Sequence, residues 1–390
     1  MMCSHRLTNA LLATVLIAVV ADTNAYAVEP DKAMKDRLHQ VAPAKDTVFQ
    51  FVSAERLIGQ ESGRAVLVPG PPDSFDSFSV GKPDVVFDGK IYRMWYTGSP
   101  RPAIYTGEVA AIGLATSEDG IHWKRANDGK PVLEKGKPGA FDEARVEAGC
   151  ALYDKDEGIW RMWYTGLMKP GTQPRPSNWS AIPAGWECRL RIGLAVSKDG
   201  INWIRQNDGK PVVDLGPMGS TDDLQVMCPT VIKEKDGYRM WYATNAISIP
   251  HTTSMATSPD GIHWTKHRDG APVEGLGWYV TGPAVYKQAD EYLMLSSPQD
   301  LEMNLWVVKA AVSRNGVNWN VLNNGKSVGP AGDDLQFKGK RVAEEGSTHH
   351  PSSAIRVGDD LLFWYTENAG QGKGYRISAG KLKMDWPKGK

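Results

Sequence analysis

The sequence predicts an all-β fold, a five-bladed β-propeller of four-stranded antiparallel blades. Three segments support this prediction because each returns along the chain: a turn followed by a Trp, an aromatic strand, and a strand with a central Pro. Returning segments in a fixed order are typical of repeat architectures. Units of four strands set around a central channel are typical of propellers.

The turn segment has the pattern Ser-x-Asp/Asn-Gly-x-x-Trp, and its four copies occupy residues 117–123, 197–203, 258–264 and 313–319. Asp-Gly and Asn-Gly between apolar runs favour a tight hairpin turn, because both central residues can adopt positive φ. Each copy therefore predicts two antiparallel strands. We expect the Trp that ends each copy to pack between neighbouring sheets.

The aromatic strand segment occurs at 93–98, 161–166, 239–244 and 362–366, with a weaker copy at 293–295. Aromatic and aliphatic residues in such density indicate a strand that is covered on both faces. The third segment precedes it and carries Pro83, Pro229, Pro283 or Pro351, whereas the second blade has Gly149 at this place. We expect this segment to form the innermost strand of each blade.

The last unit lacks the Asp-Gly turn, which residues 383–386 replace. A propeller closes into a ring, so we expect residues 48–57 to complete this blade from the start of the chain. A long solenoid is the alternative arrangement of such repeats. A solenoid would need more than five units of this size to form its binding face and its caps.

The first 27 residues have the pattern of a secretory signal: Arg6, an apolar run at 11–21, and small residues at 25–27. The run is shorter than the roughly 20 residues needed to span a bilayer, so we expect no membrane insertion. The prediction is a secreted or periplasmic protein, with a lead-in at 28–46 and the propeller domain at 47–390.

Acidic and basic residues balance at 45 each, so no net charge attracts nucleic acid or an anionic membrane. A neutral oligo- or polysaccharide is the expected partner. After removal of the signal, Cys150, Cys188 and Cys228 remain, so at most one internal disulfide forms. No nucleotide-binding, zinc-finger or His-Glu-x-x-His motif predicts a cofactor.

On these segments the chain resembles the arabinanase, levansucrase and invertase superfamily of five-bladed propellers, and within it the proteins with Met-Trp-Tyr-Thr-Gly and Ser-x-Asp-Gly-Ile-x-Trp blade signatures. The resemblance covers nearly the whole chain after the signal. It implies cleavage or transfer of glycosides in a funnel at one end of the central channel. The innermost strands would supply the reacting groups.

Glycoside cleavage uses one carboxylic acid and a second carboxylate. The resemblance to family 43 hydrolases places an Asp directly before the first inner-strand Pro, where this chain has Lys82. The place at which a catalytic Glu is sought in the third blade lies near Cys228. The chain thus departs from the family pattern at two positions.

Other carboxylates stand nearby and are catalytic candidates: Asp76, Asp142 and Asp222 each lie four residues ahead of an inner-strand Val. The alternative is that each Asp caps the turn leading into its blade. Glu147 differs because it lies inside an inner strand and has no acidic counterpart in the other blades. An unrepeated polar residue at a repeated position points to function.

His349 and His350 precede the inner-strand Pro of the fifth blade, where family 43 arabinanases place a histidine near a channel ion. His349 is therefore a candidate for substrate binding and His350 for a channel-bound calcium ion. Calcium takes 6 to 8 oxygen ligands, so two histidines do not complete such a site. The alternative is a hydrogen-bonded histidine packed between blades.

Lys82 and Arg145, with Gln225 on the third inner strand, are further candidates for substrate binding. A basic cluster of Lys82, Arg145 and a histidine would suit phosphate, as in the mannoside phosphorylases of family 130. The alternative is a simple ion pair of Lys82 with Glu147 or Asp142. The second blade also carries a Pro-rich insertion with Trp179 and Trp186, whose faces suit stacking against a sugar ring.

The leading hypothesis is a carbohydrate-active enzyme, a glycoside hydrolase that uses the carboxylates named above. A glycoside phosphorylase is the second hypothesis, and its turnover would depend on inorganic phosphate. A glycan-binding propeller without catalysis is the third.

Overall fold

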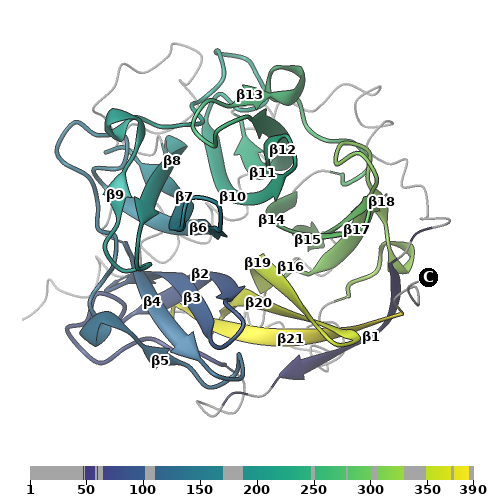
Figure 1. The fold of residues 1–390 in the computed structure, drawn as a ribbon, viewed down its shortest axis with the longest axis horizontal. Coiled ribbons are helices and arrows are strands. Elements are labelled where there is room, and N and C mark those ends of the chain that lie inside the picture. Colours follow the sequence, from purple (N-terminus) through teal and green to yellow (C-terminus); the bar gives the residue numbers. More distant parts are fainter. Residues whose placement is uncertain are drawn as a thin grey trace, which may run out of the picture.

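The computed structural model describes residues 47, 49–57, 59, 65–101, 110–169, 188–246, 251–277, 280–300, 305–328, 348–369 and 373–385. The fold is all-β, and its antiparallel sheets are arranged around a central axis (Figure 1). The helical elements of the described part are short 3-10 turns, η2 (Asn127–Gly129), η4 (Asn207–Gly209), η5 (His267–Gly270) and η6 (Asn323–Gly325).

Three units of the repeat form sheets of four strands each, in chain order from the axis outward. The second and third units join into one sheet of eight strands through a single parallel pair, Gln225 with Leu190. The strands are β2 (Ser79–Phe87), β3 (Tyr92–Ser99), β4 (Ala111–Ser117), β5 (Lys124–Arg125), β6 (Arg145–Asp154), β7 (Ile159–Leu167), β8 (Leu190–Ser197), β9 (Ile204–Arg205), β10 (Gln225–Glu234), β11 (Gly237–Asn245), β12 (Thr252–Ser258) and β13 (Thr265–Lys266).

The next unit has an added strand, and the last unit takes a strand from the start of the chain. The strands are β14 (Val280–Gln288), β15 (Glu291–Asp300), β16 (Leu305–Trp306), β17 (Lys309–Ser313) and β18 (Asn320–Val321), then β19 (Thr348–Val357), β20 (Asp360–Asn368), β21 (Tyr375–Asp385) and β1 (Gln50–Leu57). β1 pairs antiparallel with β21, which confirms the predicted closing strand (Figure 1).

The strands β2, β6, β10, β14 and β19, here called the inner strands, lie nearest the axis (Figure 1). Each inner strand contacts the next, and β19 contacts β2, so these strands form a closed ring. The end of this ring at which the inner strands begin is called the starting end below.

The Asp-Gly segments join antiparallel strands as predicted, but the expected tight turn was wrong. Gly120 has positive φ (77°), whereas Asp119 is not among the residues with positive φ. Asp119 instead accepts hydrogen bonds from the backbone N–H groups of Ile121 and His122 at 2.9 and 2.8 Å. The Asp side chain therefore stabilises a longer loop between β4 and β5, and this replaces a two-residue turn.

At four seams between units, an indole reaches the glycine of a neighbouring turn. Trp95 donates its indole N–H to the Gly200 carbonyl at 3.0 Å, and Trp364 of the last unit donates to Gly120 of the first at 2.8 Å. A Cβ added to Gly120 would lie 2.9 Å from Trp364. The glycine is therefore required by its backbone angle and by the approach of the indole.

The seam between the last two units is built differently. Leu295 occupies the register position that Trp95 has in the first unit, and the last unit has no Asp-Gly turn to receive an indole. Phe49, which is fully buried ahead of β1, joins Leu295 and Phe363 in one apolar cluster. Both partners of the repeated contact are absent at this seam, and apolar packing replaces them.

A second set of seam contacts uses the Thr of the aromatic strands. Thr97, Thr165 and Thr366 accept hydrogen bonds from backbone N–H groups of the next inner strand, those of Ala148 (2.9 Å), Cys228 (3.0 Å) and Lys82 (2.7 Å). Each hydroxyl satisfies an N–H group at a place where the strand ladder is interrupted.

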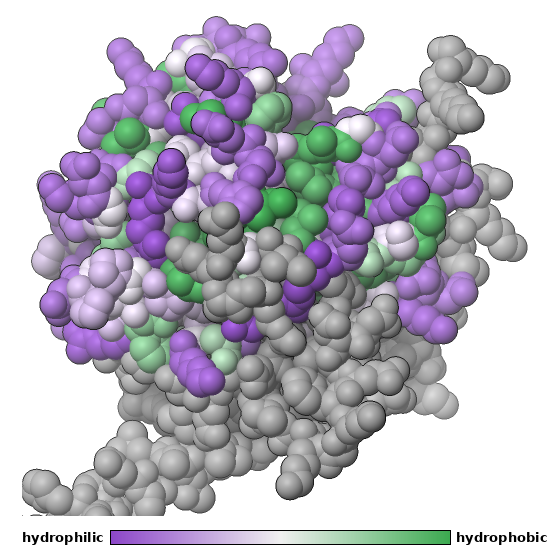
Figure 2. All heavy atoms as spheres, turned by 90° about the horizontal axis from the view of Figure 1, so that it is seen from below, coloured by the Kyte–Doolittle hydropathy of each residue, from purple (hydrophilic) through white to green (hydrophobic). Residues whose placement is uncertain are grey.

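Hydrophilic residues cover much of the described surface in the view of Figure 2, with hydrophobic residues in smaller areas between them. The exposed large apolar side chains are few among the described residues, and they are Val52, Phe87, Tyr153, Ile204, Met218 and Val357. Within the described ranges, no helix has the length and apolar character to cross a membrane.

Substitution Thr165→Val is expected to lower the free energy of unfolding by about 1–3 kcal/mol, because the buried Cys228 N–H loses its acceptor. Urea unfolding followed by tryptophan fluorescence measures this change. Thr257→Val is the matched control, because Thr257 is exposed on β12. An equal effect of both substitutions would show that the hydroxyl of Thr165 contributes no seam bond.

Candidate functional site

The inner strands are interrupted near their starting end. The pairing of β2 with β3 shifts between Gly81 and Asp84, and the pairing of β10 with β11 shifts between Met227 and Thr230. Lys82, with φ of 48°, lies inside the first of these bulges. Left-handed backbone is costly for residues other than glycine, and bulges redirect side chains next to functional sites.

The redirected Lys82 side chain meets a carboxylate of the neighbouring inner strand. Its Nζ atom contacts Oε2 of Glu147, while the Arg145 guanidinium lies 3.0 Å from Oε1 of the same carboxylate. The side chains are 17%, 9% and 7% exposed for Lys82, Glu147 and Arg145. The structure thus brings together three of the residues that the sequence singled out.

Glu147 is ionised in this setting. Burial by itself would raise its pKa, but the cations of Lys82 and Arg145 outweigh burial and hold the pKa at about 2. Burial would likewise lower the pKa of Lys82, and the charge and hydrogen bond of Glu147 keep it raised. At neutral pH the group is therefore a carboxylate held between two cations, which makes it a weak base and fits the role of a nucleophile better.

Cys228 and His251 also interact electrostatically with Lys82. Cys228 also has positive φ (52°), and burial raises the pKa of its thiol, so the thiol is neutral. Burial and the charge of Lys82 lower the pKa of His251 to about 4, so its imidazole is neutral as well. Both side chains are polar and uncharged beside the ion pair.

Asp84 lies further along β2 and has the opposite ionisation. Burial raises its pKa to about 8, although the Ala151 N–H, which donates to Oδ2 at 2.7 Å, opposes the shift. The Oγ of Ser353 and the Sγ of Cys150 accept backbone N–H groups of the next inner strand in the same way. Asp84 therefore belongs to a third set of seam contacts and is protonated at neutral pH.

The three repeated aspartates lie apart from Glu147 and have no solvent exposure. Asp76 accepts from Tyr96 Oη (2.9 Å) and Arg125 Nε (2.8 Å). Asp142 bonds Tyr164 and Arg205 in the same way, and Asp222 bonds Lys266. Each aspartate ties the segment ahead of an inner strand to the outermost strand of its own unit.

The remaining candidates are placed only in part. The Gln225 amide donates to the Cys188 carbonyl at 3.1 Å and so links the third unit to the second. Trp179 and Trp186 lie outside the described residues, as do the side chains of His349 and His350 on β19. Among the described residues, no group of three or more His, Cys, Asp or Glu side chains could hold a metal ion. The calcium ion stays a prediction.

The sequence interpretation missed His251. It directly precedes β12, at the register position that Ala110 and Leu190 occupy in the first two units. An unrepeated polar residue at a repeated position is the signal that singled out Glu147. The same signal, applied to the third strand of each unit, would have found His251.

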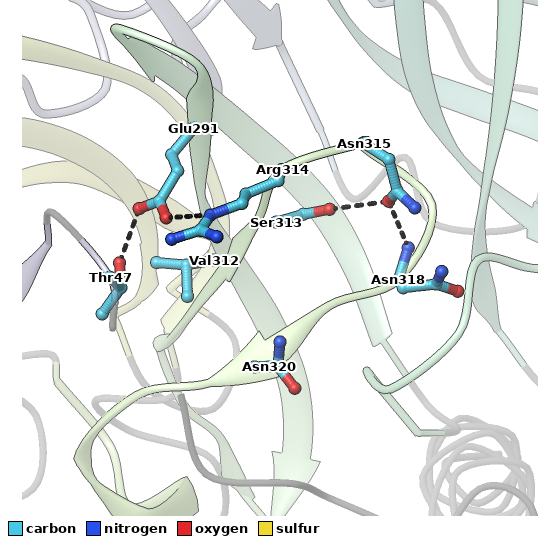
Figure 3. A pocket seen from close by; sticks show the side chains of 8 residues that line it. All are labelled: Thr47, Glu291, Val312, Ser313, Arg314, Asn315, Asn318 and Asn320. Carbon is cyan, nitrogen blue, oxygen red and sulfur yellow. Dashed lines mark hydrogen bonds and ion pairs between the residues drawn. The ribbon is translucent and has the colours of Figure 1, made fainter. Parts of the chain in front are cut away.

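A pocket of about 260 Å³ lies elsewhere, between the start of the described chain and the unit of β14–β18. Its carboxylate, Glu291, accepts a hydrogen bond from Thr47 at 2.7 Å and pairs with Arg314 at 2.9 Å (Figure 3). The other lining residues are Val312, Ser313, Asn315, Asn318 and Asn320. The pocket shares no residue with the Lys82–Glu147 group.

The fold and this polar group at the starting end define a class of protein, a propeller-like chain with a buried ionic group on its inner strands. No protein-family profile matches the sequence. The chain is 25% identical over 252 residues to an uncharacterized protein of Mycobacterium tuberculosis (strain ATCC 25618 / H37Rv), covering 62% of this chain and 75% of the relative.

The chain is also similar to the A type blood N-acetyl-α-D-galactosamine deacetylase of Flavonifractor plautii. The two are 26% identical over 228 residues, which cover 54% of this chain and 27% of the deacetylase. The similarity thus spans little more than a quarter of the relative's length.

Solved structures show the same propeller-like fold. Zg3597, a family 117 glycoside hydrolase of Zobellia galactanivorans, has a TM-score of 0.59 and 15% identity, with 85% of this chain and 91% of the other covered. A GH130 structure, reported with glycoside hydrolases that target β-1,2 mannosidic linkages, has a TM-score of 0.57 and 15% identity, with 87% and 96% covered. The GH32 β-fructofuranosidase BmSUC1 of Bombyx mori has a TM-score of 0.53 and 13% identity, with 89% of this chain and 64% of the other covered.

Substitution Asp84→Asn is expected to stabilise the protein, and more so at high pH. The pKa of Asp84 is about 8 in the folded chain against an ordinary value of 3.8, so folding takes up a proton between these values. Stability is therefore lost as pH rises through this window, by at most about 1.4 kcal/mol per pH unit. The amide of the variant would carry no such cost, and the Tm difference from wild type should grow from pH 4 to pH 8.

Asp88 gives a control of opposite sign. Burial would raise its pKa, but the N–H groups of Ile91 and Lys90 and the charge of Arg93 lower it. This stabilisation is present above the ordinary pKa and is lost as pH falls, so Asp88→Asn should lower Tm most at neutral pH. A Tm difference for Asp84→Asn that does not change with pH would refute the protonated state.

Proposed function

We propose that this chain is a carbohydrate-active enzyme, a glycoside hydrolase that acts on oligo- or polysaccharide at the starting end of its inner strands. The observation that carries the proposal is the Glu147 carboxylate, which is ionised and held between Lys82 and Arg145. The fold shared with glycoside hydrolases supports it.

We assign Glu147 the role of nucleophile, because it is ionised at neutral pH, whereas its pKa of about 2 makes it a weak base. Lys82 and Arg145 orient the carboxylate through its two oxygens. A glycosidase also needs an acid for the leaving group. We assign Asp76, Asp142 and Asp222 to the scaffold instead, since each is buried in a pair with a cation of its own unit.

The proposal includes a five-bladed propeller. The five units that it counts are β2–β5, β6–β9, β10–β13, β14–β18, and β19–β21 completed by β1. The single parallel pair between Gln225 and Leu190 is then a contact of two adjacent blades. The proposal also includes export, on the predicted signal at residues 1–27, which would give the site access to glycans outside the cytoplasm.

Deacetylation of an amino sugar is a second candidate, favoured by the similarity to the Flavonifractor plautii deacetylase. An ionised Glu147 would there accept a hydrogen bond from the attacking water and orient it. The products separate the candidates: a hydrolase releases reducing sugar, a phosphorylase releases sugar phosphate only with inorganic phosphate, and a deacetylase releases acetate. A screen of chromogenic glycosides, polysaccharides and N-acetylated sugars, with and without phosphate and chelator, measures all three products.

Substitution Glu147→Gln is expected to lower turnover by about 10²-fold or more, because an amide cannot act as base or nucleophile. Asp142→Asn is the matched control. It weakens the buried bonds to Tyr164 and Arg205 and should lower stability by about 1–3 kcal/mol while turnover per folded molecule is retained. Turnover on a substrate found in the screen and the Tm of each variant are the measurements.

Equal turnover of Glu147→Gln and wild type, with both variants folded, would rule out Glu147 as the reacting group. If Asp142→Asn is fully folded but loses turnover, the repeated aspartates take part in catalysis and are not only scaffold residues. Tight saccharide binding by the wild type, with no product after long incubation, would favour the glycan-binding hypothesis instead.

A further inference from the structure

The pocket of about 260 Å³ lies at the seam between the last two units, where the repeated indole contact is missing. Val312 lines the pocket and belongs to the same apolar cluster as Phe49 and Leu295. Thr47, which also lines the pocket, lies two positions ahead of Phe49. The segment that packs at this seam in place of a turn therefore forms one side of the pocket.

A carboxylate at this side of the pocket departs from the repeat. Glu291 occupies the register position of Ile159 in the second unit and of Gly237 in the third. Its side chain is 7% exposed. Thr47 and Arg314 each donate to a different carboxylate oxygen, at 2.7 and 2.9 Å (Figure 3). Glu291 is thus fixed in place and does not carry an unpaired charge.

The turn at the other side of the pocket departs from the repeat as well. In the second unit, Asn202 donates to the carboxylate of Asp199 at 2.7 Å. The fourth copy of the turn has Asn315 in place of this Asp. The Asn315 side chain accepts the backbone N–H of Asn318 at 2.9 Å, and no hydrogen bond joins the two side-chain amides (Figure 3). The exchange of Asp for Asn therefore frees the amide of Asn318.

Two amides that line the pocket are available to a ligand. The side-chain amides of Asn318 and Asn320 have no hydrogen-bond partner among the described residues. Ile204 and Thr265 occupy the register position of Asn320 in the second and third units. An amide offers two donors and one acceptor oxygen. Both amides can therefore donate to a bound molecule and accept from it.

The lining matches an uncharged ligand with hydroxyl groups. Glu291 and Arg314 form an ion pair, and the other lining residues are Val, Ser, Thr and Asn, so the pocket has no net charge. Its hydroxyls and amides both donate and accept, as sugar hydroxyls do, whereas a carboxylate only accepts and an ammonium only donates. Pockets for drug-sized ligands occupy about 300–1,000 Å³, so this smaller volume suits one sugar ring.

We propose that this pocket is a second saccharide-binding site, which holds one uncharged sugar unit of a glycan chain through its hydroxyl groups and cleaves no bond. Asn318 and Asn320 form the hydrogen bonds to these hydroxyls. The inference rests on the proposed carbohydrate function. It adds a place of attachment that is separate from the Lys82–Glu147 group.

The two sites lie toward opposite ends of the inner strands. Glu291 pairs with Gln288, the last residue of β14, whereas Glu147 has the register position of Thr281 near the start of β14. At about 3.3 Å per residue, these two levels are roughly 20 Å apart along the strand. One sugar unit cannot occupy both sites, but a long glycan bound at both gains affinity, because its second contact forms within one complex.

Affinity electrophoresis in gels that contain arabinan, levan, galactan or mannan tests the pocket. The protein is the full chain without its predicted signal segment, in the Glu147→Gln background so that the polymer is not cleaved. The double substitution Asn318→Ala with Asn320→Ala is expected to raise the dissociation constant of the retained polysaccharide by about tenfold, because two hydrogen-bonding amides are lost. Circular dichroism confirms that the variant is folded.

Thr265→Ala is the matched control, because Thr265 is exposed at the register position of Asn320 in the third unit. It should leave retention unchanged. With Glu147 restored, the double variant should have a higher KM for the polysaccharide and an unchanged kcat on a small chromogenic glycoside. The small substrate reaches only the site of Glu147, so a purely structural defect would lower both activities.

The outcomes separate this inference from the proposed function. If every polysaccharide that retains the wild type retains the double variant equally, the second site is refuted, and the role of Glu147 is untouched. If polygalacturonate retains the wild type and the double variant loses this retention, the pocket takes an anionic ligand and the assignment to an uncharged sugar is overturned. If the wild type neither binds nor cleaves any glycan, the proposed function fails and the second site fails with it.

Discussion

The ring depends on one interaction, the indole N–H of an aromatic strand that donates to the turn glycine of the next unit. The turn's own Trp donates to the same carbonyl, as Trp163 and Trp264 both do at Gly261, at 2.8 and 3.0 Å. A Cβ on Gly261 would lie 2.9 Å from Trp163, so the glycine and the two tryptophans are constrained together. This coupling explains why the indole and the turn are both missing where Leu295 faces the last unit.

The repeated seam contacts hold the inner strands in position. The side chains of the inner strands near the axis are not part of these contacts, so they can differ from unit to unit. Glu147 has Gly81, Met227 and Thr281 at equivalent register positions. The repeated residues Asp76, Asp142 and Asp222 hold each unit together, whereas the unrepeated ones meet at the starting end. Repetition therefore marks the scaffold, and departure from repetition marks the candidate site.

This division also sets how much the sequence could predict. The strands followed from local patterns, because turn motifs and aromatic density act over a few residues. The closing strand β1 followed from the expectation that the repeats close into a ring. The contact of Lys82 with Glu147 spans 65 positions, and the opposite ionisation of Glu147 and Asp84 depends on burial and nearby charge. Neither this contact nor these ionisation states can be read from residues that are neighbours in the sequence. His251 was missed because only inner strands were searched for unrepeated polar residues.

The candidate site depends on closure of the whole ring, since different units supply its parts. The backbone N–H of Lys82 is held by Thr366 of the last unit, and its side chain meets Glu147 of the second. Thr165 of the second unit in turn holds the N–H of Cys228 in the third. A break at any of these seams would release a residue whose left-handed backbone is costly to maintain. The position of the Glu147 carboxylate therefore depends on the stability of the seams. The pairing of β1 with β21 contributes to that stability, although β1 and β21 are far from Glu147 along the chain.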